Sequence, residues 1–223
     1  MKFRFFIFAT FSLFSHLPDG WEKFQQKMLA EQATLPGWCS QEKACRMAEL
    51  IFEVHPKICV EIGVFGGASL YPTTAALQFL DHGKVYAIDS WNRKDALEGH
   101  FSKDPDYIWW SQIDLEKIFA GFLKLIRDHH LDPYCIPMRM RTDQAALYFL
   151  NASVDILHID GNHASRFLLF DVETWLPKVK RGGYIWLNDA HLPSAKAAVE
   201  KLLRFCEKNP HRSTNECVLF RKK

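Results

Sequence analysis

The sequence predicts an α/β fold with a doubly wound, mostly parallel sheet, helices on both faces and an antiparallel C-terminal strand. Three observations predict it. From residue 58 onward, short apolar segments rich in β-branched residues alternate with segments of helical periodicity. A glycine-rich turn follows the first of these strands, and acidic residues stand where three of the others end. The chain of 223 residues can form one domain with a sizeable core, so we expect a Rossmann-like architecture.

The first strand and the turn after it are the stretch around which the rest is organised. The run from Ile58 to Val64 is short and apolar, as expected of a buried parallel strand. Glycines at positions 63, 66 and 67 allow a tight turn and a close approach to a ligand. Ser69 stands near the start of the next helix, where backbone N–H groups are unpaired. A carboxylate inside an apolar strand needs a partner, so we expect Glu61 to face a ligand crevice.

The glycine pattern distinguishes between two classes of nucleotide-binding turn. The dinucleotide fingerprint needs glycine at position 65, where this chain has Phe65. The pattern present, Glu-x-Gly-x-x-Gly-Gly-x-Ser, resembles the first motif of class I S-adenosylmethionine (SAM)-dependent methyltransferases. Asp89 ends the second predicted strand, 28 positions after Glu61. An acid there can accept both hydroxyls of a ribose, a role that fits SAM and NAD alike.

The remaining elements follow from hydrophobic periodicity, caps and breakers. Ser40 is the expected N-cap of the second helix. We expect helices over 21–33, 40–54, 69–80, 111–129, 163–176 and 194–206, with strands over 58–64, 84–91, 134–139, 154–160, 181–187 and 217–220. A weak sixth strand is expected near Arg212. The segment from Thr142 is expected to begin a helix, and it either lies beside the adenine, if the ligand is SAM, or is a simple helix cap. The aromatic-rich stretch from 91 to 110 is either a lid or substrate wall, or a plain packing loop.

A second group of polar residues follows the fourth and fifth strands. Asp160 ends one strand, and Asn188 and Asp189 end the next, so parallel pairing brings their oxygen atoms to the same rim. Such oxygen ligands suit a hard divalent cation such as Mg²⁺. His163 lies three positions beyond Asp160 and could take a proton from a substrate hydroxyl.

A wider resemblance follows from these motifs. The run Ile159-Asp160-Gly161-Asn162-His163, then Asp171, Trp175-Leu176-Pro177, Gly182-Gly183 and Asn188-Asp189, is similar to a family of SAM-dependent methyltransferases. That family includes macrolide-sugar O-methyltransferases and cephalosporin-hydroxylase-type proteins. The resemblance implies Mg²⁺ ligation by Asp160 and Asp189, a basic role for His163, and SAM contacts for Glu61 and Asp89. The chain departs from it at Asn188, where an acid is usual, and at Ser165, where an aromatic residue is usual.

The predicted site therefore has three parts. The expected catalytic residues are His163 and Asp160, and the expected metal ligands are Asp160, Asn188 and Asp189. The expected SAM-binding residues are Glu61, Gly63, Val64, Phe65, Gly67, Ser69, Asp89, Ser90, Thr142, Asp143 and Asp160. We predict Mg²⁺-assisted O-methylation of a small hydroxylated substrate. The alternatives are a degenerate SAM-binding or interaction domain without catalysis, and an NAD-linked oxidoreductase.

The amino-acid composition limits which classes of partner the protein can bind. The net charge is +2, and the basic clusters are scattered and not interleaved with aromatic residues, so we expect a small-molecule substrate and no nucleic acid. A homo-oligomer is left open. The six cysteines form no C-x-x-C pair, which disfavours a zinc site and favours a reduced, cytoplasmic protein.

The N-terminus complicates that localisation. Lys2 and Arg4 precede an apolar run ending near Phe14, which resembles a signal peptide and leaves export open for residues 1–17. The run is too short for a transmembrane helix, so no membrane span is expected. We divide the chain into an N-terminal extension with helices, residues 1–56, and a methyltransferase domain, residues 57–223.

Overall fold

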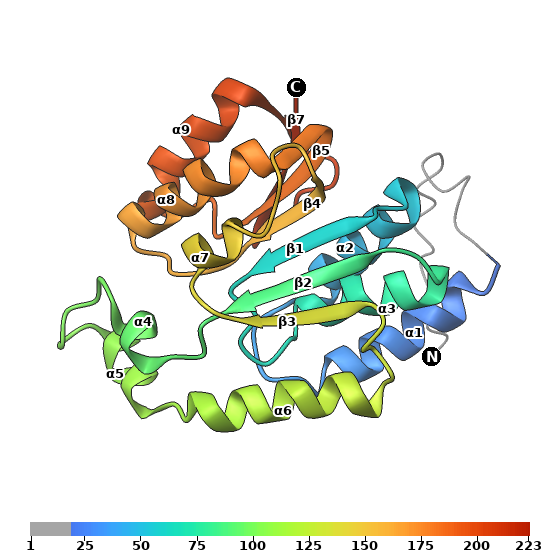
Figure 1. Cartoon of the computed structure of the whole chain (residues 1–223), viewed down its shortest axis with the longest axis horizontal. Helices are drawn as coiled ribbons and strands as arrows, with labels where there is room; N and C mark the ends of the chain where they lie inside the picture. Colours follow the sequence, from blue (N-terminus) through green and yellow to red (C-terminus); the bar gives the residue numbers. More distant parts are fainter. Residues whose placement is uncertain (1–18) are drawn as a thin grey trace, which may run out of the picture.

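A seven-stranded sheet forms the centre of the part of the chain that the computed structural model describes, residues 19–223. The signal-like segment predicted over residues 1–17 lies outside the described residues. Across the sheet the strand order is β3 (Cys135–Arg139), β2 (Lys84–Asp89), β1 (Ile58–Ile62), β4 (Val154–Ile159), β5 (Val179–Asn188), β7 (Cys217–Lys222) and β6 (Cys206–Asn209). The strands β1 to β5 pair in parallel, whereas β7 runs antiparallel to both β5 and β6 (Figure 1). The predicted doubly wound fold with an antiparallel C-terminal strand is confirmed.

Helices cover both faces of this sheet (Figure 1). One face packs against α1 (Trp21–Gln32), α2 (Gln41–Val54), α3 (Leu70–Leu80) and α6 (Leu115–Asp128). The other packs against α7 (Thr142–Ala146), α8 (Ser165–Trp175) and α9 (Lys196–Phe205). Two short helices, α4 (Arg93–Leu97) and α5 (Pro105–Gln112), lie beyond the carboxyl end of β2 (Figure 1). Short 3₁₀ turns at Leu176–Lys178 and Pro193–Ala195 complete the elements.

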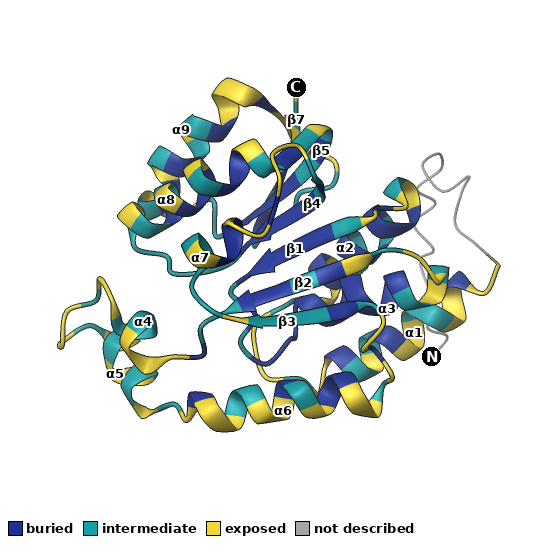
Figure 2. Cartoon of the chain, viewed as in Figure 1, coloured by how far each residue is buried: buried dark blue, intermediate teal, exposed yellow. Residues whose placement is uncertain are grey.

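Alternation along each strand assigns side chains to one face or the other. In β1, Cys59 belongs to the core beneath α2 and α3, whereas Val60 and Ile62 belong to the core beneath α8 and α9. Most residues of the central strands β1 and β4 are buried, as Figure 2 shows. By the same alternation Glu61 shares the face of Cys59, so its carboxylate lies on the side that α2 and α3 cover.

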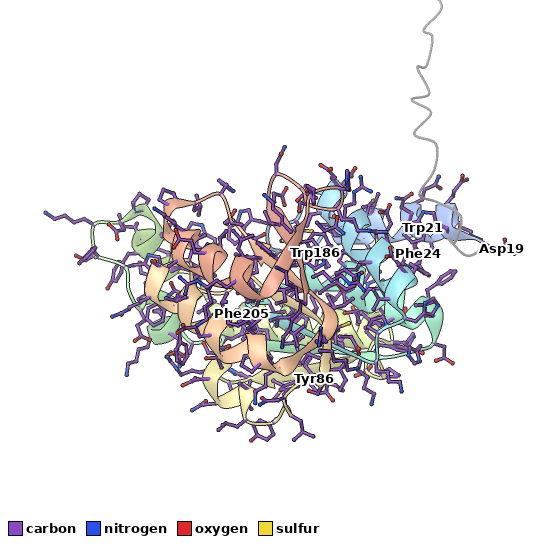
Figure 3. The ribbon with its side chains drawn as sticks, turned by 90° about the horizontal axis from the view of Figure 1, so that it is seen from above. Asp19, Trp21, Phe24, Tyr86, Trp186 and Phe205 are labelled. Atoms are coloured by element: carbon purple, nitrogen blue, oxygen red, sulfur yellow. The ribbon has the colours of Figure 1, made fainter. Side chains whose placement is uncertain are left out.

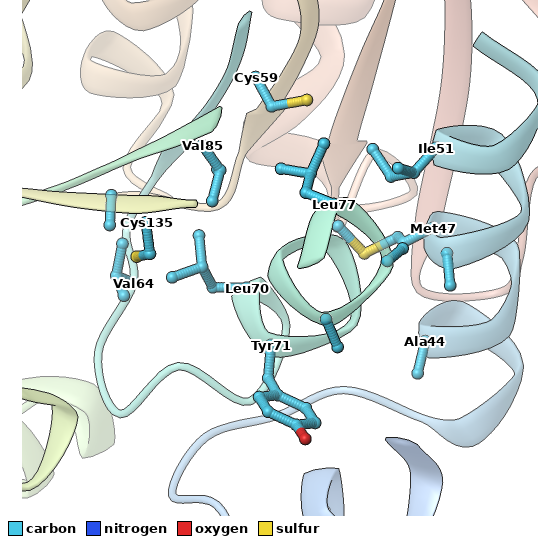
Figure 4. Packing of buried hydrophobic residues seen from close by; sticks show 14 of the residues in the cluster. Ala44, Met47, Ile51, Cys59, Val64, Leu70, Tyr71, Leu77, Val85 and Cys135 are labelled. Atoms are coloured by element: carbon cyan, nitrogen blue, oxygen red, sulfur yellow. The ribbon is translucent and has the colours of Figure 1, made fainter. Parts of the chain in front are cut away.

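The helices that precede β1 share a core with the sheet. Met47 and Ile51 of α2 face Leu77 of α3, and Cys59 lies above them from the sheet (Figure 4). Farther out, Trp21 and Phe24 of α1 lie side by side, with ring centroids 5.5 Å apart (Figure 3). The described residues before position 57, from residue 19 onward, therefore share a core with the sheet. The division at that residue stays a prediction.

The largest differences from the predicted boundaries concern three elements. The helix expected over 111–129 is two helices, because Asp114 accepts the backbone N–H of Lys117 and starts α6 there. Strand β5 begins at Val179, earlier than the glycine pair suggested. The strand expected near Arg212 is instead β6 at Cys206–Asn209, and Arg212 lies in the turn that follows.

Two further findings concern the protein's surroundings. All six cysteines lie in the described part of the chain, and all six are free thiols. Within residues 19–223, no helix is both long and apolar enough to cross a membrane.

Candidate active site at the carboxyl ends of the strands

A cavity of about 500 Å³ opens at the carboxyl ends of β1, β2, β4 and β5. This volume lies within the usual range for small-molecule sites. Its walls come from the turn after β1, the end of β2, the segment containing α4 and α5, and the turns after β4 and β5. The cavity therefore lies at the edge of the sheet that the sequence predicted.

The turn after β1 is closed by contact with the turn after β4. Gly63 has a φ of 82°, and a Cβ built on it would lie 2.1 Å from the carbonyl oxygen of Asp160. No side chain fits there, since real Cβ atoms do not come so close. Its N–H donates to the carbonyl of Ile88 at 2.9 Å. Glycine at this position therefore holds the ends of β1, β2 and β4 against one another.

Asp89 is held by that turn. Its Oδ2 accepts the backbone N–H groups of Val64 and Phe65 at 3.0 and 2.9 Å, and its Oδ1 accepts that of Trp91 at 2.8 Å. Burial raises the pKa of Asp89, and the three amide hydrogen bonds offset only part of that effect. The carboxylate lines the cavity, but three of its acceptor positions are already used. Ribose binding by Asp89 stays a prediction that requires its remaining lone pair or a rearrangement.

Glu61 lies beneath the turn and does not line the cavity. Only 1% of its surface is exposed, and the hydroxyl of Ser69 donates to its Oε1 at 2.6 Å. His158, its partner in the parallel register of β1 and β4, places Nδ1 3.0 Å from its Oε2. The expected crevice-facing carboxylate is thus a buried group that anchors the start of α3 through Ser69.

The other predicted SAM-binding residues divide in the same way. Those that line the cavity are Gly63, Val64, Phe65, Ser69, Asp89, Ser90, Thr142 and Asp160. Gly67 and Asp143 do not. A Cβ on Gly67 would instead press on Phe122 of α6 at 3.1 Å, and the carboxylate of Asp143 faces the guanidinium of Arg141 at 3.5 Å. The geometry leaves these two without a direct contact to the cavity.

The predicted catalytic residues do come together. His163 Nε2 lies 3.5 Å from Oδ1 of Asp160 and 3.7 Å from Oδ2 of Asp189. Burial opposes the charged imidazolium, but the neighbouring carboxylates outweigh it and raise the pKa of His163. A histidine between two carboxylates is well placed to accept a proton, because both stabilise the resulting positive charge.

Sequence reasoning missed Lys43, which lies at the start of α2 and is 1% exposed. Its Nζ donates to Oδ2 of Asp160 at 3.2 Å and to Oδ1 of Asn188 at 2.7 Å. A signal was present, because Lys43 stands four residues before Met47, on the apolar stripe of its helix. A lysine on a buried helix face needs an acidic partner. His158 carried a similar signal, as a polar residue within an apolar strand.

The donor set does not fit Mg²⁺. Two of its three predicted ligands, Asp160 and Asn188, already bind the ammonium group of Lys43. The third, Asp189, points its carboxylate toward His163. Among the described residues, no group of three or more His, Cys, Asp or Glu side chains is arranged to hold a metal ion. The metal site predicted from the sequence therefore stays a prediction, and a lysine side chain already contacts two of its three expected ligands.

The aromatic-rich stretch from 91 to 110 forms part of the cavity wall. A wall was one of the two interpretations given from the sequence. Trp109 and Trp110 of α5 line the cavity together with Trp38, which precedes α2. The Trp38 ring stacks on Phe65, with centroids 5.6 Å apart, and meets Trp109 at 5.2 Å. Because Trp38 is 65% exposed, a broad aromatic surface borders the opening.

Comparison with known sequences agrees with this geometry. The sequence model of a methyltransferase domain family matches residues 60–190, more than half of the chain. The chain belongs to this methyltransferase family. The matched segment runs from β1 to the end of β5 and contains the glycine turn, Asp89, Asp160 and His163. Membership favours the methyltransferase interpretation over an NAD-linked oxidoreductase.

Solved structures show the same fold. The O-methyltransferase NovP superposes with a TM-score of 0.64 at 19% identity, covering 82% of this chain and 81% of NovP. The methyltransferase PaMTH1 of Podospora anserina, bound to S-adenosylhomocysteine (SAH), gives 0.58 at 13% identity, with 93% and 89% covered. An O-methyltransferase from Bacillus cereus in complex with SAH gives 0.59 at 13% identity, with 90% and 91% covered. The fold is that of SAM-dependent methyltransferases.

A curated relative adds little about activity. The uncharacterized protein y4gI of Sinorhizobium fredii is 24% identical over 145 residues, which are 64% of this chain. The match covers 14% of that much longer protein.

Proposed function

We propose that this protein transfers the methyl group of SAM to a hydroxyl oxygen of a small acceptor. One observation carries the proposal. A single cavity is lined by the glycine turn and Asp89, where β1 and β2 end, and by His163 with its two carboxylates, where β4 and β5 end. The first part, the cofactor end, offers the groups expected for the cofactor, and the second part, the base end, offers a base for the acceptor.

The chemistry asks little of the protein beyond placement and proton removal. SAM, when bound, supplies an electrophilic methyl group on a sulfonium. As the acceptor oxygen forms its bond to the methyl carbon, the carbon–sulfur bond breaks and SAH is left. His163 takes the acceptor's hydroxyl proton. Asp160 orients the imidazole and, with Asp189, stabilises its positive charge. The Mg²⁺ assistance predicted from the sequence is not part of this mechanism.

The wall of the cavity supports an acceptor with a flat apolar face. Trp38, Trp109 and Trp110 supply ring surfaces at its opening. Two nearby acids, Asp95 and Glu98, are paired with Arg141 at 2.8 and 3.1 Å. A hydroxylated ring, such as a sugar or a phenol, would present one face to these aromatic side chains and an oxygen to the far end.

Calorimetric titration with SAH, with NAD as the control ligand, tests the cofactor. We expect SAH to bind with a stoichiometry of one and NAD not to bind. Asp89→Asn should weaken SAH binding roughly 10- to 100-fold, as loss of a charged hydrogen-bond acceptor does. Binding of NAD, or no binding of SAH, would refute the proposal.

The rival interpretation, a SAM-binding module without catalysis, predicts SAH binding with no turnover of any acceptor. A screen of hydroxylated ring compounds with SAM, read as SAH formed, separates the two. The position of His163 between two carboxylates favours catalysis. SAH formation that depends on an acceptor and disappears in His163→Ala would exclude the module.

A further inference from the structure

We propose that the ammonium group of Lys43 takes the place of a divalent cation at the ends of β4 and β5, so that this site needs no metal. Its part in methyl transfer rests on the proposed function, whereas the absence of a metal site does not. The proposal follows from the contacts of one buried side chain, its charge balance and its place in the fold.

The ammonium group of Lys43 already occupies two of the oxygen atoms that a metal would bind. Oδ2 of Asp160 and Oδ1 of Asn188 lie 3.2 and 2.7 Å from its Nζ. Mg²⁺ would need to approach each of them to about 2.1 Å. The point that satisfies both is the region where the ammonium stands. A cation could enter only after the lysine had withdrawn from a buried position.

The charges also match a lysine better than a metal. Lys43 and Asp160 neutralise each other one to one, and the neutral Asn188 adds an acceptor without adding charge. An acid at position 188 would leave these three groups with a net negative charge. The neutral Asn188 therefore suits the lysine opposite it.

The fold delivers this lysine from a distant segment. Strand alternation puts Asp160 and Asn188 on the face that α2 covers, the same face as His158 and Trp186. The hydroxyl of Ser40 accepts the N–H of Lys43 at 3.2 Å and fixes the start of α2. The first turn of α2 thus places an ammonium directly above the ends of β4 and β5.

The bound lysine acts as a positioning residue. It holds Oδ2 of Asp160, which leaves Oδ1 directed at His163 at 3.5 Å. Because Nζ of Lys43 also donates to Oδ1 of Asn188, the ammonium is fixed at both strand ends and holds the orientation of Asp160 without a metal.

Manganese binding tests the proposal without reference to turnover. The full chain, stripped with EDTA and desalted, is titrated with Mn²⁺, and the free ion is measured by electron paramagnetic resonance. We expect no stoichiometric Mn²⁺ site in the wild type. Lys43→Ala, which frees the oxygens of Asp160 and Asn188, should gain one site per chain, and the double variant that adds Asp160→Asn should lose it.

Three outcomes would overturn the proposal. One is a stoichiometric Mn²⁺ site in the wild type that Asp160→Asn removes. Another is a folded Lys43→Ala variant, checked by circular dichroism, that gains no Mn²⁺ site. The third is SAH affinity in the wild type that falls at least tenfold on replacing Mg²⁺ by EDTA. Should Lys43→Ala not fold, the wild type and Asp160→Asn decide alone: no Mn²⁺ site in the wild type supports the proposal.

These results are separable from the methyltransferase proposal. If SAH fails to bind under any condition, the proposed function falls, while the manganese result still decides whether Lys43 fills the cation position. If SAH binds and Mn²⁺ also binds at Asp160, the function stands and the role of Lys43 falls.

Discussion

The two ends of the cavity stabilise a buried aspartate in different ways. At the end of β2, Asp89 accepts three backbone N–H groups, and its pKa is still raised because burial dominates. At the end of β4, burial acts on Asp160 in the same direction, but the ammonium of Lys43 and the nearby histidines lower its pKa. A full positive charge compensates for burial where amide dipoles do not.

The two arrangements also differ in how far apart their parts lie in the chain. The amides that bind Asp89 come from positions 24 and 25 residues before it and 2 residues after it. Lys43 lies 117 residues from Asp160 and 145 from Asn188. The cofactor end is built largely within one β–α–β unit, whereas the base end depends on a helix that precedes the whole sheet.

The largest expected effect comes from adding a side chain where the turn after β1 meets the turn after β4. Gly63→Ala forces a Cβ against the carbonyl oxygen of Asp160 and requires a left-handed alanine. We expect it to lose roughly 3–5 kcal/mol of stability in urea unfolding. Gly20→Ala is the matched control, since Gly20 also has a positive φ but has nothing within 4 Å of an added Cβ. It should lose only about 1–2 kcal/mol. Equal losses would mean that backbone strain, not the contact with Asp160, makes glycine necessary at 63.

The next prediction separates cofactor binding from proton removal. His163→Ala should lower kcat roughly 10²- to 10⁴-fold, because the acceptor proton then has no base, and should leave SAH affinity within about twofold. Asp89→Asn should do the reverse, weakening SAH binding more than it changes kcat at saturating SAM. The measurement is calorimetric SAH binding beside steady-state kinetics. Joint loss of both quantities in His163→Ala would identify that histidine as structural.

The last effect depends on pH and concerns a third acid of the cavity, Asp171 of α8, which has neither three amides nor a lysine. Burial raises its pKa to about 7, and its Oδ1 has no hydrogen-bond partner. Between about pH 4 and 7 the folded state therefore holds a proton that the unfolded state has released. Stability should fall as pH rises through this window, by up to about 1.4 kcal/mol per pH unit, and then level off.

Asp171→Asn should remove this contribution, because an amide does not titrate. The check is urea unfolding of the wild type and the variant at half-unit steps from pH 4.5 to 8. The difference between the two curves should change across the window and be constant above about pH 7.5. A constant difference throughout would show that Asp171 titrates as an ordinary aspartate.

Local patterns predicted the fold well, and eight of the eleven expected SAM-binding residues line the cavity. The apolar run at β1, the glycines after it and the acid at the end of β2 each act within one turn or one crossover, so their spacing is informative. Ser40 was correctly predicted as the N-cap of α2, and its hydroxyl does accept the N–H of Lys43. The break within residues 111–129 was missed because the apolar spacing continues across it. Asp114 nevertheless acts as an N-cap and starts a new helix there.

The sequence by itself determined that Asp160, Asn188 and Asp189 meet at one edge, because parallel strands end together. Only the tertiary structure decided what lies between them. The choice between a metal ion and an ammonium depends on how α2 packs across the sheet, a contact between segments more than a hundred residues apart. No local spacing encodes it, since the same oxygen atoms suit either cation and only packing places Lys43 within reach of them.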